Sequence, residues 1–261
     1  MGRLLGLVSL VLGLAIAPAW AQTERVVNIP TRPGVTQRML VLGAEKPKAA
    51  VILFAGGHGG LMLTSQGVLG WGRGNFLVRT RALFAQQGLL VAVVDAPSDR
   101  QAPPYLSGFR QTREHAADVK AVIAWLKKEA GVPVWLVGTS RGTQSVGSLA
   151  TSLPLAEGGP DGIVLTSTIL TDPKGRPVPD MPIDRIKAPV LVVHHKQDGC
   201  SLCRYADINA LMGRLTATSR KELLTFDGGT GKGDPCEAFS YHGYAGIEAD
   251  VVAKIGAWVV Q

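Results

Sequence analysis

Short apolar runs alternate with amphipathic segments along most of this chain. Four runs rich in Val, Ile, Leu and Ala have the length of strands, at residues 49–54, 89–94, 132–137 and 188–193. Near-continuous apolar runs of this length are typical of strands buried on both faces of a sheet. Residues 162–170 and 221–226 are also predicted to be strands.

The amphipathic segments predict helices between these strands. Residues 113–130 have the clearest pattern, because apolar residues recur at i, i+3, i+4 and i+7 and form one stripe. These residues are Val119, Val122, Ile123 and Leu126. Further helices are predicted at 75–87, 141–153, 203–216 and 245–259. Near the start, residues 26–32 and 35–43 alternate loosely around Pro33-Gly34, which predicts an antiparallel hairpin.

Alternation of strands and helices predicts an α/β fold. We expect a doubly wound, mostly parallel sheet with right-handed crossovers and helices on both faces. A chain of 261 residues suits one such domain, and no repeat or linker divides it. Only about 17 residues separate the strands that end at 170 and begin at 188, so there is no room for a substantial cap domain.

The first 21 residues are predicted to be a secretory signal peptide rather than part of the fold. Arg3 precedes an apolar run from Leu4 to Ala17, and Ala19-Trp20-Ala21 supplies the small residues of a processing point. The run is shorter than the roughly 20 residues of a membrane span. We therefore expect a single mature domain over 22–261, exported to the periplasm or secreted and with no stable membrane span. An uncleaved N-terminal anchor is the alternative.

Composition and charge narrow the possible partners. The chain is 46% hydrophobic and 18% charged, which argues against disorder. Its formal net charge is +7, and loss of Arg3 with the signal peptide would leave +6. The basic residues are scattered, without interleaved aromatic residues, so nucleic acid is not an expected partner. The charge supports only a mild preference for anionic substrates or surfaces.

The strand at 132–137 leads into the motif Gly138-Thr139-Ser140-Arg141-Gly142, with a helix predicted directly after it. A serine at such a corner lies in a tight turn, and the flanking glycines avoid collisions with neighbouring backbone. Its hydroxyl is exposed beside a helix N-terminus, where negative charge is favoured. By itself the G-x-S-x-G pattern is weak, since Gly and Ser are common in ordinary turns.

Other chemically active residues also follow predicted strands. Residues 56–60, Gly-Gly-His-Gly-Gly, follow the strand at 49–54 and could direct backbone N–H groups into a cavity. Asp198 follows the strand that begins at 188, and His242 lies in the loop after 221–226. Because ligands bind at the carboxyl ends of strands in such sheets, these groups are expected to meet there. The rival acids are Asp172 and Asp95, and each residue could instead be an ordinary loop residue.

Together these residues have the order and the chemistry of a serine hydrolase. A serine hydroxyl becomes nucleophilic when an imidazole accepts its proton and a carboxylate orients that imidazole. Ser140, His242 and Asp198 are the candidate catalytic residues. The backbone N–H of Arg141, with one from Gly57 or His58, would stabilise the oxyanion.

On these motifs the sequence resembles the α/β-hydrolases over nearly all of the mature chain, and is most similar to their compact, dienelactone-hydrolase-like branch. The resemblance implies a hydrolase that acts mostly on esters and related small acyl compounds and needs no cofactor. The chain departs from many members in having Gly-Gly-His-Gly-Gly instead of His-Gly-Gly-Gly. The second oxyanion donor could therefore be either of two adjacent residues, Gly57 or His58. A peptidase or amidase with the same triad, or a non-catalytic binding protein, are the alternatives. Arg73, Arg100 and Arg141 could form a cationic rim for an acidic substrate, or be solvated surface.

Three cysteines, Cys200, Cys203 and Cys236, leave one thiol unpaired within the chain or bonded to another molecule. C-x-x-C after His194 and His195 has ligand-like spacing, but zinc sites usually pair two such clusters, so a disulfide is favoured over a metal. We favour Cys200–Cys236, which would join the loops of Asp198 and His242. Cys203–Cys236 and Cys200–Cys203 remain open. One of the adjacent histidines is expected in the core and the other beside the site, and His115 on a helix flank without a function.

Overall fold

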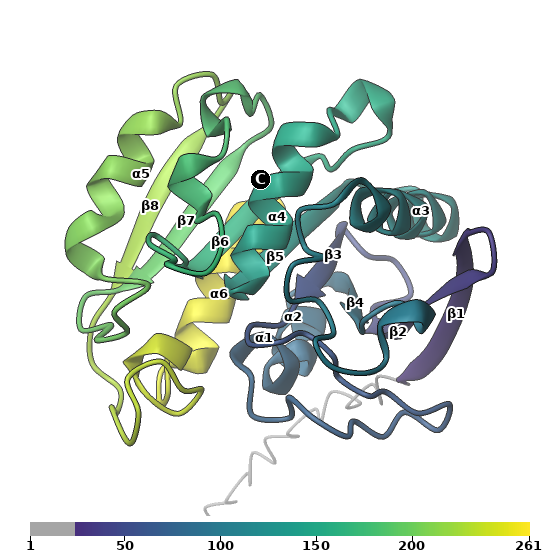
Figure 1. Cartoon of the computed structure of the whole chain (residues 1–261), viewed down its shortest axis with the longest axis horizontal. Helices are drawn as coiled ribbons and strands as arrows, with labels where there is room; N and C mark the ends of the chain where they lie inside the picture. The colour runs from purple at the N-terminus through teal and green to yellow at the C-terminus, as the bar shows by residue number, and fades with distance from the viewer. Residues whose placement is uncertain (1–23) are drawn as a thin grey trace, which may run out of the picture.

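The computed structural model describes residues 24–261, so the predicted signal peptide lies outside the described residues. One eight-stranded sheet forms the centre of the protein, in the order β1-β2-β4-β3-β5-β6-β7-β8 (Figure 1). The hairpin β1–β2 and the pair β2–β4 are antiparallel, and all other neighbours are parallel. The strands are β1 (Arg25–Arg32), β2 (Val35–Gly43), β3 (Ala49–Phe54), β4 (Leu89–Val94), β5 (Val134–Ser140), β6 (Gly162–Thr168), β7 (Val190–His195) and β8 (Lys221–Phe226).

Helices cover both faces of the sheet, as the apolar strands require (Figure 1). On one face, α3 (Arg113–Ala130), α4 (Gly142–Ser152) and α5 (Ile208–Arg214) pack on side chains such as Ile52. On the other, α1 (Phe76–Arg79), α2 (Arg81–Gln86) and α6 (Glu248–Val259) pack on residues such as Leu53. Neighbouring strand residues therefore supply two separate cores. The predicted doubly wound α/β architecture is confirmed.

Three predicted helices are shorter or interrupted. The helix predicted over 75–87 divides at Thr80, whose hydroxyl donates a 2.7 Å hydrogen bond to the Phe76 carbonyl and ends α1. The helix predicted over 203–216 is α-helical only over 208–214, because residues 205–207 form a 3₁₀ turn in which the Asp207 N–H bonds to the Arg204 carbonyl. The last helix begins at Glu248 because Gly246 has a φ of 87°, outside the helical region.

The segment between β6 and β7, residues 169–189, lies against the body of the domain. It contains two 3₁₀ turns, Val178–Asp180 and Ile183–Arg185, which pack on α4. Val178 and Ile183 are fully buried there. Within residues 24–261 no cap domain covers the carboxyl edge of the sheet at this position, as the short spacing predicts. None of the helices formed by these residues is long and apolar enough to cross a membrane.

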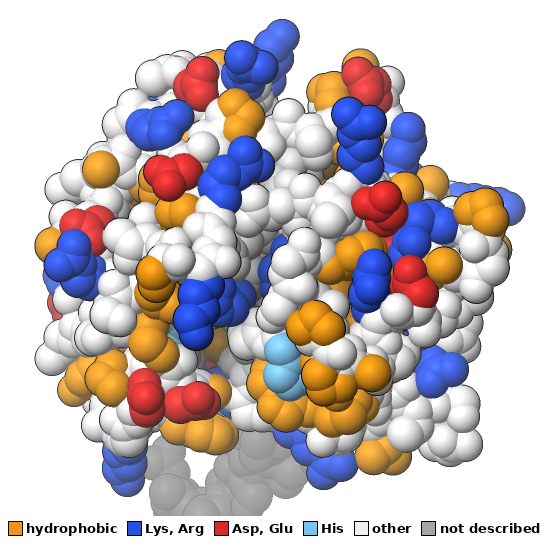
Figure 2. Space-filling view, in the orientation of Figure 1, with side chains coloured by type: hydrophobic (Ala, Val, Ile, Leu, Met, Phe, Trp, Pro, Cys, Tyr) orange, Lys and Arg blue, Asp and Glu red, His pale blue; other side chains and the backbone are white. Residues whose placement is uncertain are grey.

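Lys and Arg side chains are spread over the visible face of the molecule and interspersed with acidic and apolar ones (Figure 2). Several of the basic side chains are paired, as in the contacts between Arg81 and Glu24 and between Lys196 and Asp227. Exposed pairs of this kind contribute little to stability, about 0–1 kcal/mol each. They do reduce the local potential that the formal net charge would otherwise produce.

Candidate active site

Ser140 ends β5 in a strained backbone conformation, with a φ of 52°. The neighbouring glycines are there because no side chain fits. A Cβ on Gly142 would lie 2.1 Å from the Phe54 carbonyl oxygen, and one on Gly138 would lie 2.6 Å from the Gly142 oxygen. A non-glycine residue at positive φ persists only where its surroundings hold it, and such residues concentrate at functional sites. The predicted tight strand-to-helix turn is present, and its serine is partly exposed.

Asp198 and His242 meet although 44 positions separate them in the chain. His242 Nδ1 lies 2.9 Å from Asp198 Oδ2, and both side chains are buried. The other carboxylate oxygen accepts a 3.0 Å hydrogen bond from the Cys200 N–H. With the proton on Nδ1 donated to Asp198, the imidazole has its free lone pair on Nε2. No other group in residues 24–261 bonds to this buried Nε2.

One cavity connects the serine to the histidine. Ser140, His242 and Gly57 line a hollow of about 280 Å³ at the carboxyl edge of the sheet. Its walls include the aromatic side chains of Trp71, Phe76 and Phe239. Gly74 lets Phe239 approach, since a Cβ there would lie 3.0 Å from the ring. The residue types predicted for a hydrolytic site thus face a small cavity with largely apolar walls.

The glycine loop passes directly beside Ser140. A Cβ on Gly56 would lie 3.0 Å from the Cβ of Ser140, and one on Gly57 would lie 2.6 Å from the Trp71 ring. Gly57 has a φ of 56° and lines the cavity. The side chain of His58 is instead stacked between Trp71 and Tyr105, with centroid distances of 3.9 and 4.4 Å. Of the two residues predicted to supply the second oxyanion donor, Gly57 lines the cavity with Ser140 and His58 does not.

A buried arginine holds this loop and was not found from the sequence. The guanidinium of Arg110 donates to the carbonyls of Ala55 and Gly57, at 3.0 and 3.2 Å, and to the Ser145 hydroxyl at 3.1 Å. It therefore ties the loop to the first turns of α4. Burial, and secondarily the charge of Arg141, lowers the pKa of Arg110 to about 9. No sequence signal reveals Arg110, because two of its three partners are backbone carbonyls.

The turn that carries His242 is fastened to the centre of the sheet by two further residues. The hydroxyl of Ser167, at the end of β6, donates to the His242 carbonyl at 2.7 Å. The Tyr244 hydroxyl accepts from the Ser167 N–H at 3.1 Å and donates to the Val193 carbonyl at 2.8 Å. Ser167 and Tyr244 have positive φ values of 44° and 57°. These contacts fix the height of the imidazole above the sheet.

Removing these contacts should loosen the histidine without removing it. We expect Ser167→Ala and Tyr244→Phe each to lower kcat of the hydrolysis about tenfold, since a lost buried hydrogen bond is worth about 1–2 kcal/mol. KM should change little, because neither side chain lines the cavity. Steady-state kinetics over a pH series measure both. Ser148→Ala, a buried serine on α4, is the matched control, and an equal fall in that variant would contradict a positioning role.

The rival acids have other partners. Asp95 accepts hydrogen bonds from the N–H groups of Leu61, Leu63 and Ala96 and so folds the segment after the glycine loop. Asp172 pairs with Arg141 at 2.7 Å. Burial of Asp172 opposes its ionisation, but the hydrogen bonds from Arg141, the Lys174 N–H and Gln144 outweigh it and keep the pKa below the usual value.

The three arginines considered as a cationic rim do not lie together at the cavity. Arg73 donates to the Leu69 carbonyl, and Arg100 stacks on the Phe109 ring at 4.7 Å. Neither lines the hollow between Ser140 and His242. Arg141 lines a neighbouring cavity of about 410 Å³, where Asp172 offsets its charge. Spacing along the chain could not show these separate partners.

The adjacent histidines of β7 are both in the interior. His194 Nε2 lies 2.7 Å from the Cys203 carbonyl and 3.7 Å from Asp198 Oδ2, so His194 is the one beside the site. Burial lowers its pKa. His195 Nε2 lies 2.9 Å from the Gly228 carbonyl, and its ring stacks on Tyr241. His195 is thus the packed core histidine and His194 the one beside Asp198, as predicted for the pair, although His194 is fully buried as well.

His115 lies on α3, the helix where the sequence places it, and its side chain faces the core. It is buried in the first turn of α3, with its ring edge-on to Phe54 and Phe109. Burial, and then the charges of Arg110 and Arg32, lowers the pKa of His115 to about 3. The ring is therefore neutral at ordinary pH and acts as a packing element.

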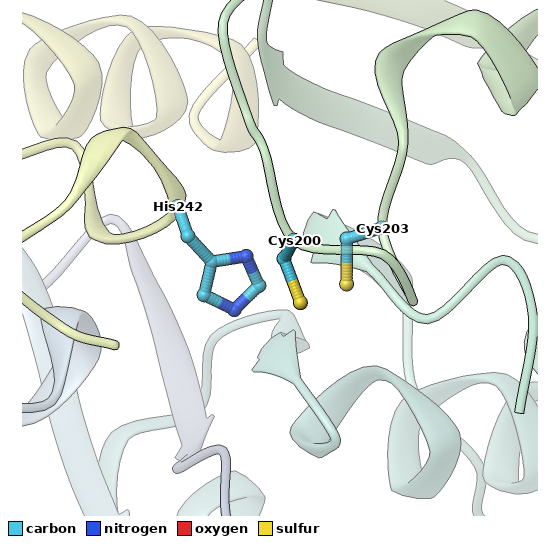
Figure 3. A group of neighbouring side chains, drawn as sticks. All are labelled: Cys200, Cys203 and His242. Atoms are coloured by element: carbon cyan, nitrogen blue, oxygen red, sulfur yellow. The ribbon is translucent and has the colours of Figure 1, made fainter. Parts of the chain in front are cut away.

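The disulfide joins Cys200 to Cys236, the pairing favoured from the sequence. Cys203 is a buried free thiol. Figure 3 shows Cys200, Cys203 and His242 converging, and their donor atoms lie within 4.8 Å of one another. Because the Cys200 sulfur is bonded to Cys236, it is not a thiolate ligand in this state. The oxidised site therefore does not have the donor set of a zinc centre, in line with the preference for a disulfide.

The bridge should contribute strongly to stability. Its cysteines are 36 positions apart, and in the chain-entropy model closing such a loop stabilises by about 3–4 kcal/mol. We expect Cys236→Ser to lower the free energy of unfolding by about that amount, as measured by urea unfolding. Cys203→Ser, which leaves the bridge intact, is the matched control. A reductant should destabilise the wild type and leave the Cys236→Ser protein unchanged; equal sensitivity of both proteins would contradict the assignment.

No family model matches the sequence, and no curated protein matches it. Solved structures do match. An esterase from Pyrococcus furiosus covers 92% of this chain and 92% of its own, with 13% identity and a TM-score of 0.64. An α/β serine hydrolase without a lid from Xanthomonas campestris covers 93% and 97%, with 13% identity and a TM-score of 0.59. A dienelactone hydrolase from Anabaena variabilis covers 91% and 96%, with 15% identity and a TM-score of 0.60.

Such low identities show the fold alone. Residues 24–261 have the α/β-hydrolase fold in its compact form, with no lid among them, and the fold implied by the sequence resemblance is confirmed.

Proposed function

We propose that this chain with the α/β-hydrolase fold is a serine hydrolase that cleaves esters of small acyl groups. The observation that carries the proposal is the hydrogen bond between His242 and Asp198, which leaves Nε2 without a partner in residues 24–261, together with the strained Ser140, which lines the same cavity as His242. Esterases and serine hydrolases among the structural neighbours agree with this chemistry.

In the proposed reaction, His242 Nε2 takes the Ser140 proton as the oxygen attacks the acyl carbonyl. Asp198 holds the imidazole in the required tautomer and stabilises the imidazolium. The N–H groups of Arg141 and Gly57 would bind the oxyanion, with His58 as the rival to Gly57. His242 then protonates the leaving alcohol. Water, activated by the same histidine, releases the acid from the acyl-serine, so no cofactor takes part.

The cavity favours small substrates. Its volume of about 280 Å³ is at the lower end of ligand sites, and aromatic side chains form much of its wall. We therefore expect esters of short or aromatic acids to react fastest. An anionic substrate is supported only by the formal net charge of +7, because Arg141 lines the neighbouring cavity and pairs with Asp172 there.

Export is proposed together with this activity. The signal-like segment 1–21 supports export. The disulfide Cys200–Cys236 agrees with it, because disulfides persist in oxidising compartments. The molecular mass of the chain recovered from the periplasm or the medium, measured by mass spectrometry, tests this expectation. A chain that begins at Gln22 would support it, and full-length protein retained in the cytoplasm would contradict it.

A fluorophosphonate probe tests the nucleophile directly. We expect the probe to label the wild type and the label to map to Ser140, with no label on Ser140→Ala. Parallel assays with p-nitrophenyl esters of increasing chain length, an anionic ester and a p-nitroanilide then define the substrate class. Turnover of the anilide at a rate similar to the esters would favour the amidase alternative. Absence of both label and turnover would favour a non-catalytic binding protein.

A further inference from the structure

Three metal-binding side chains meet beside the acid of the proposed triad. The sulfurs of Cys200 and Cys203 and one ring nitrogen of His242 all lie within 4.8 Å of one another, and all three residues are buried. Figure 3 shows that two come from the loop after β7 and the third from the turn before α6. Two thiolates and an imidazole are preferred donors for Zn²⁺ and similar soft divalent ions.

The disulfide determines whether this set is available. Cys200 cannot act as a thiolate while its sulfur is bonded to Cys236. Cys236 itself is exposed, within a run of exposed residues at 227–237, so a soluble thiol can reach the bond. Cys200 and Cys203 would stay in place after reduction, because the Cys200 N–H bonds to Asp198 and the Cys203 N–H bonds to the Cys200 carbonyl.

We propose that reduction of the Cys200–Cys236 disulfide opens a binding site for a soft divalent metal ion at Cys200, Cys203 and His242. A dithiol donates two electrons and two protons to the disulfide and becomes a disulfide itself, which leaves Cys200 and Cys236 as thiols. The metal ion then replaces one proton on each of the two coordinating sulfurs, and both protons pass to solvent.

The required movement is small. In tetrahedral zinc sites the metal–ligand distances place neighbouring donor atoms about 3.5–3.8 Å apart. Donors that now lie within 4.8 Å reach that spacing by side-chain rotation of about 1 Å each. The hydrogen bond from His242 Nδ1 to Asp198 also suits a metal bound at Nε2, since ligating histidines commonly donate their other N–H to a carboxylate.

Metal binding would stop the reaction. At Nε2 the ion takes the lone pair that accepts the Ser140 proton, and at Nδ1 it displaces Asp198. Loss of activity rests on the proposed function, whereas metal binding does not. The site would thus make a hydrolase that is active when oxidised and blocked by metal when reduced.

Cys236→Ser gives a reductant-independent test, because it frees Cys200 and removes Cys236 as a ligand. We expect this protein, titrated with Co²⁺ alone, to develop the intense visible and thiolate charge-transfer bands of tetrahedral cobalt. Oxidised wild type should not develop them, and wild type reduced with a phosphine should. In the Cys236→Ser background, Cys203→Ala should weaken Co²⁺ and Zn²⁺ binding at least about 100-fold. Loss of a residue that only hydrogen-bonds a metal ligand already lowers metal affinity by up to about 100-fold, and Cys203 would be a ligand itself.

The outcomes separate the two claims. Zn²⁺ should inhibit esterase activity of Cys236→Ser and of reduced wild type, with recovery on addition of a chelator, and should not inhibit oxidised wild type at the same concentration. Cobalt bands without any loss of activity would uphold metal binding by the two thiolates and contradict His242 as the third ligand. If both Cys236→Ser and reduced wild type remain folded by circular dichroism but bind no Co²⁺ through thiolate, the inference is wrong.

Discussion

Ser140→Ala is expected to lower kcat for the best ester about 10⁴–10⁶-fold, as loss of the nucleophile does in serine hydrolases. The alanine keeps the backbone of the β5–α4 turn but removes the oxygen proposed to form the acyl-enzyme. KM should change little, because the walls formed by Trp71, Phe76 and Phe239 remain. Stopped-time assays with high enzyme concentration are needed to measure the residual rate.

The same experiment shows whether Ser140 and His242 act as a unit. Groups that act in one step are non-additive, so Ser140→Ala combined with His242→Ala should be no slower than either single variant. Ser148→Ala, a substitution within α4, should retain kcat within a few-fold of the wild-type value. If the residual rate of Ser140→Ala were within tenfold of wild type, another residue would be the nucleophile.

Asp198→Asn is expected to lower kcat about 10⁴-fold, because an amide in this position favours the wrong tautomer of the neighbouring imidazole. Asp198 lies 2.9 Å from His242 Nδ1, and the amide oxygen of asparagine can still accept from the Cys200 N–H. The fold around the loop should therefore remain, and the loss should be in kcat. Steady-state kinetics with a thermal melt on the same sample measure the two quantities.

Asp172→Asn is the matched control for this variant. Asp172 pairs with Arg141 and not with a histidine, so Asp172→Asn breaks an ion pair whose carboxylate side chain is 1% exposed but leaves the proposed triad intact, and kcat should stay within about tenfold of wild type. Asp95→Asn should instead lower stability, because Asp95 bonds three backbone N–H groups. A larger loss of kcat in Asp172→Asn than in Asp198→Asn would transfer the role of acid to Asp172.

Local patterns were sufficient for the architecture and for the tight turn that carries Ser140. Buried strands such as 49–54 are apolar at every position, which no exposed segment tolerates, and Gly138 and Gly142 flank a serine where only glycine fits. Helix ends were predicted less well. α1 ends at Thr80, whose side chain donates a hydrogen bond to the preceding turn, and the amphipathic pattern does not predict that bond.

Tertiary structure decided which groups meet. Asp95, Asp172 and Asp198 all follow strands, and their partners, brought together by the sheet, distinguish them. The same holds for Arg110 and Ser167, which bind backbone carbonyls of distant segments.

The sequence by itself determined an α/β fold, a serine at a strained turn, and the order of serine, acid and histidine along the chain. Those features depend on neighbours within a few residues, where spacing and side-chain size suffice. Only the tertiary structure decided the partner of His242, the disulfide between Cys200 and Cys236, and the contacts that hold the glycine loop. These are contacts between residues far apart in the chain, and their geometry exists only once the strands have assembled.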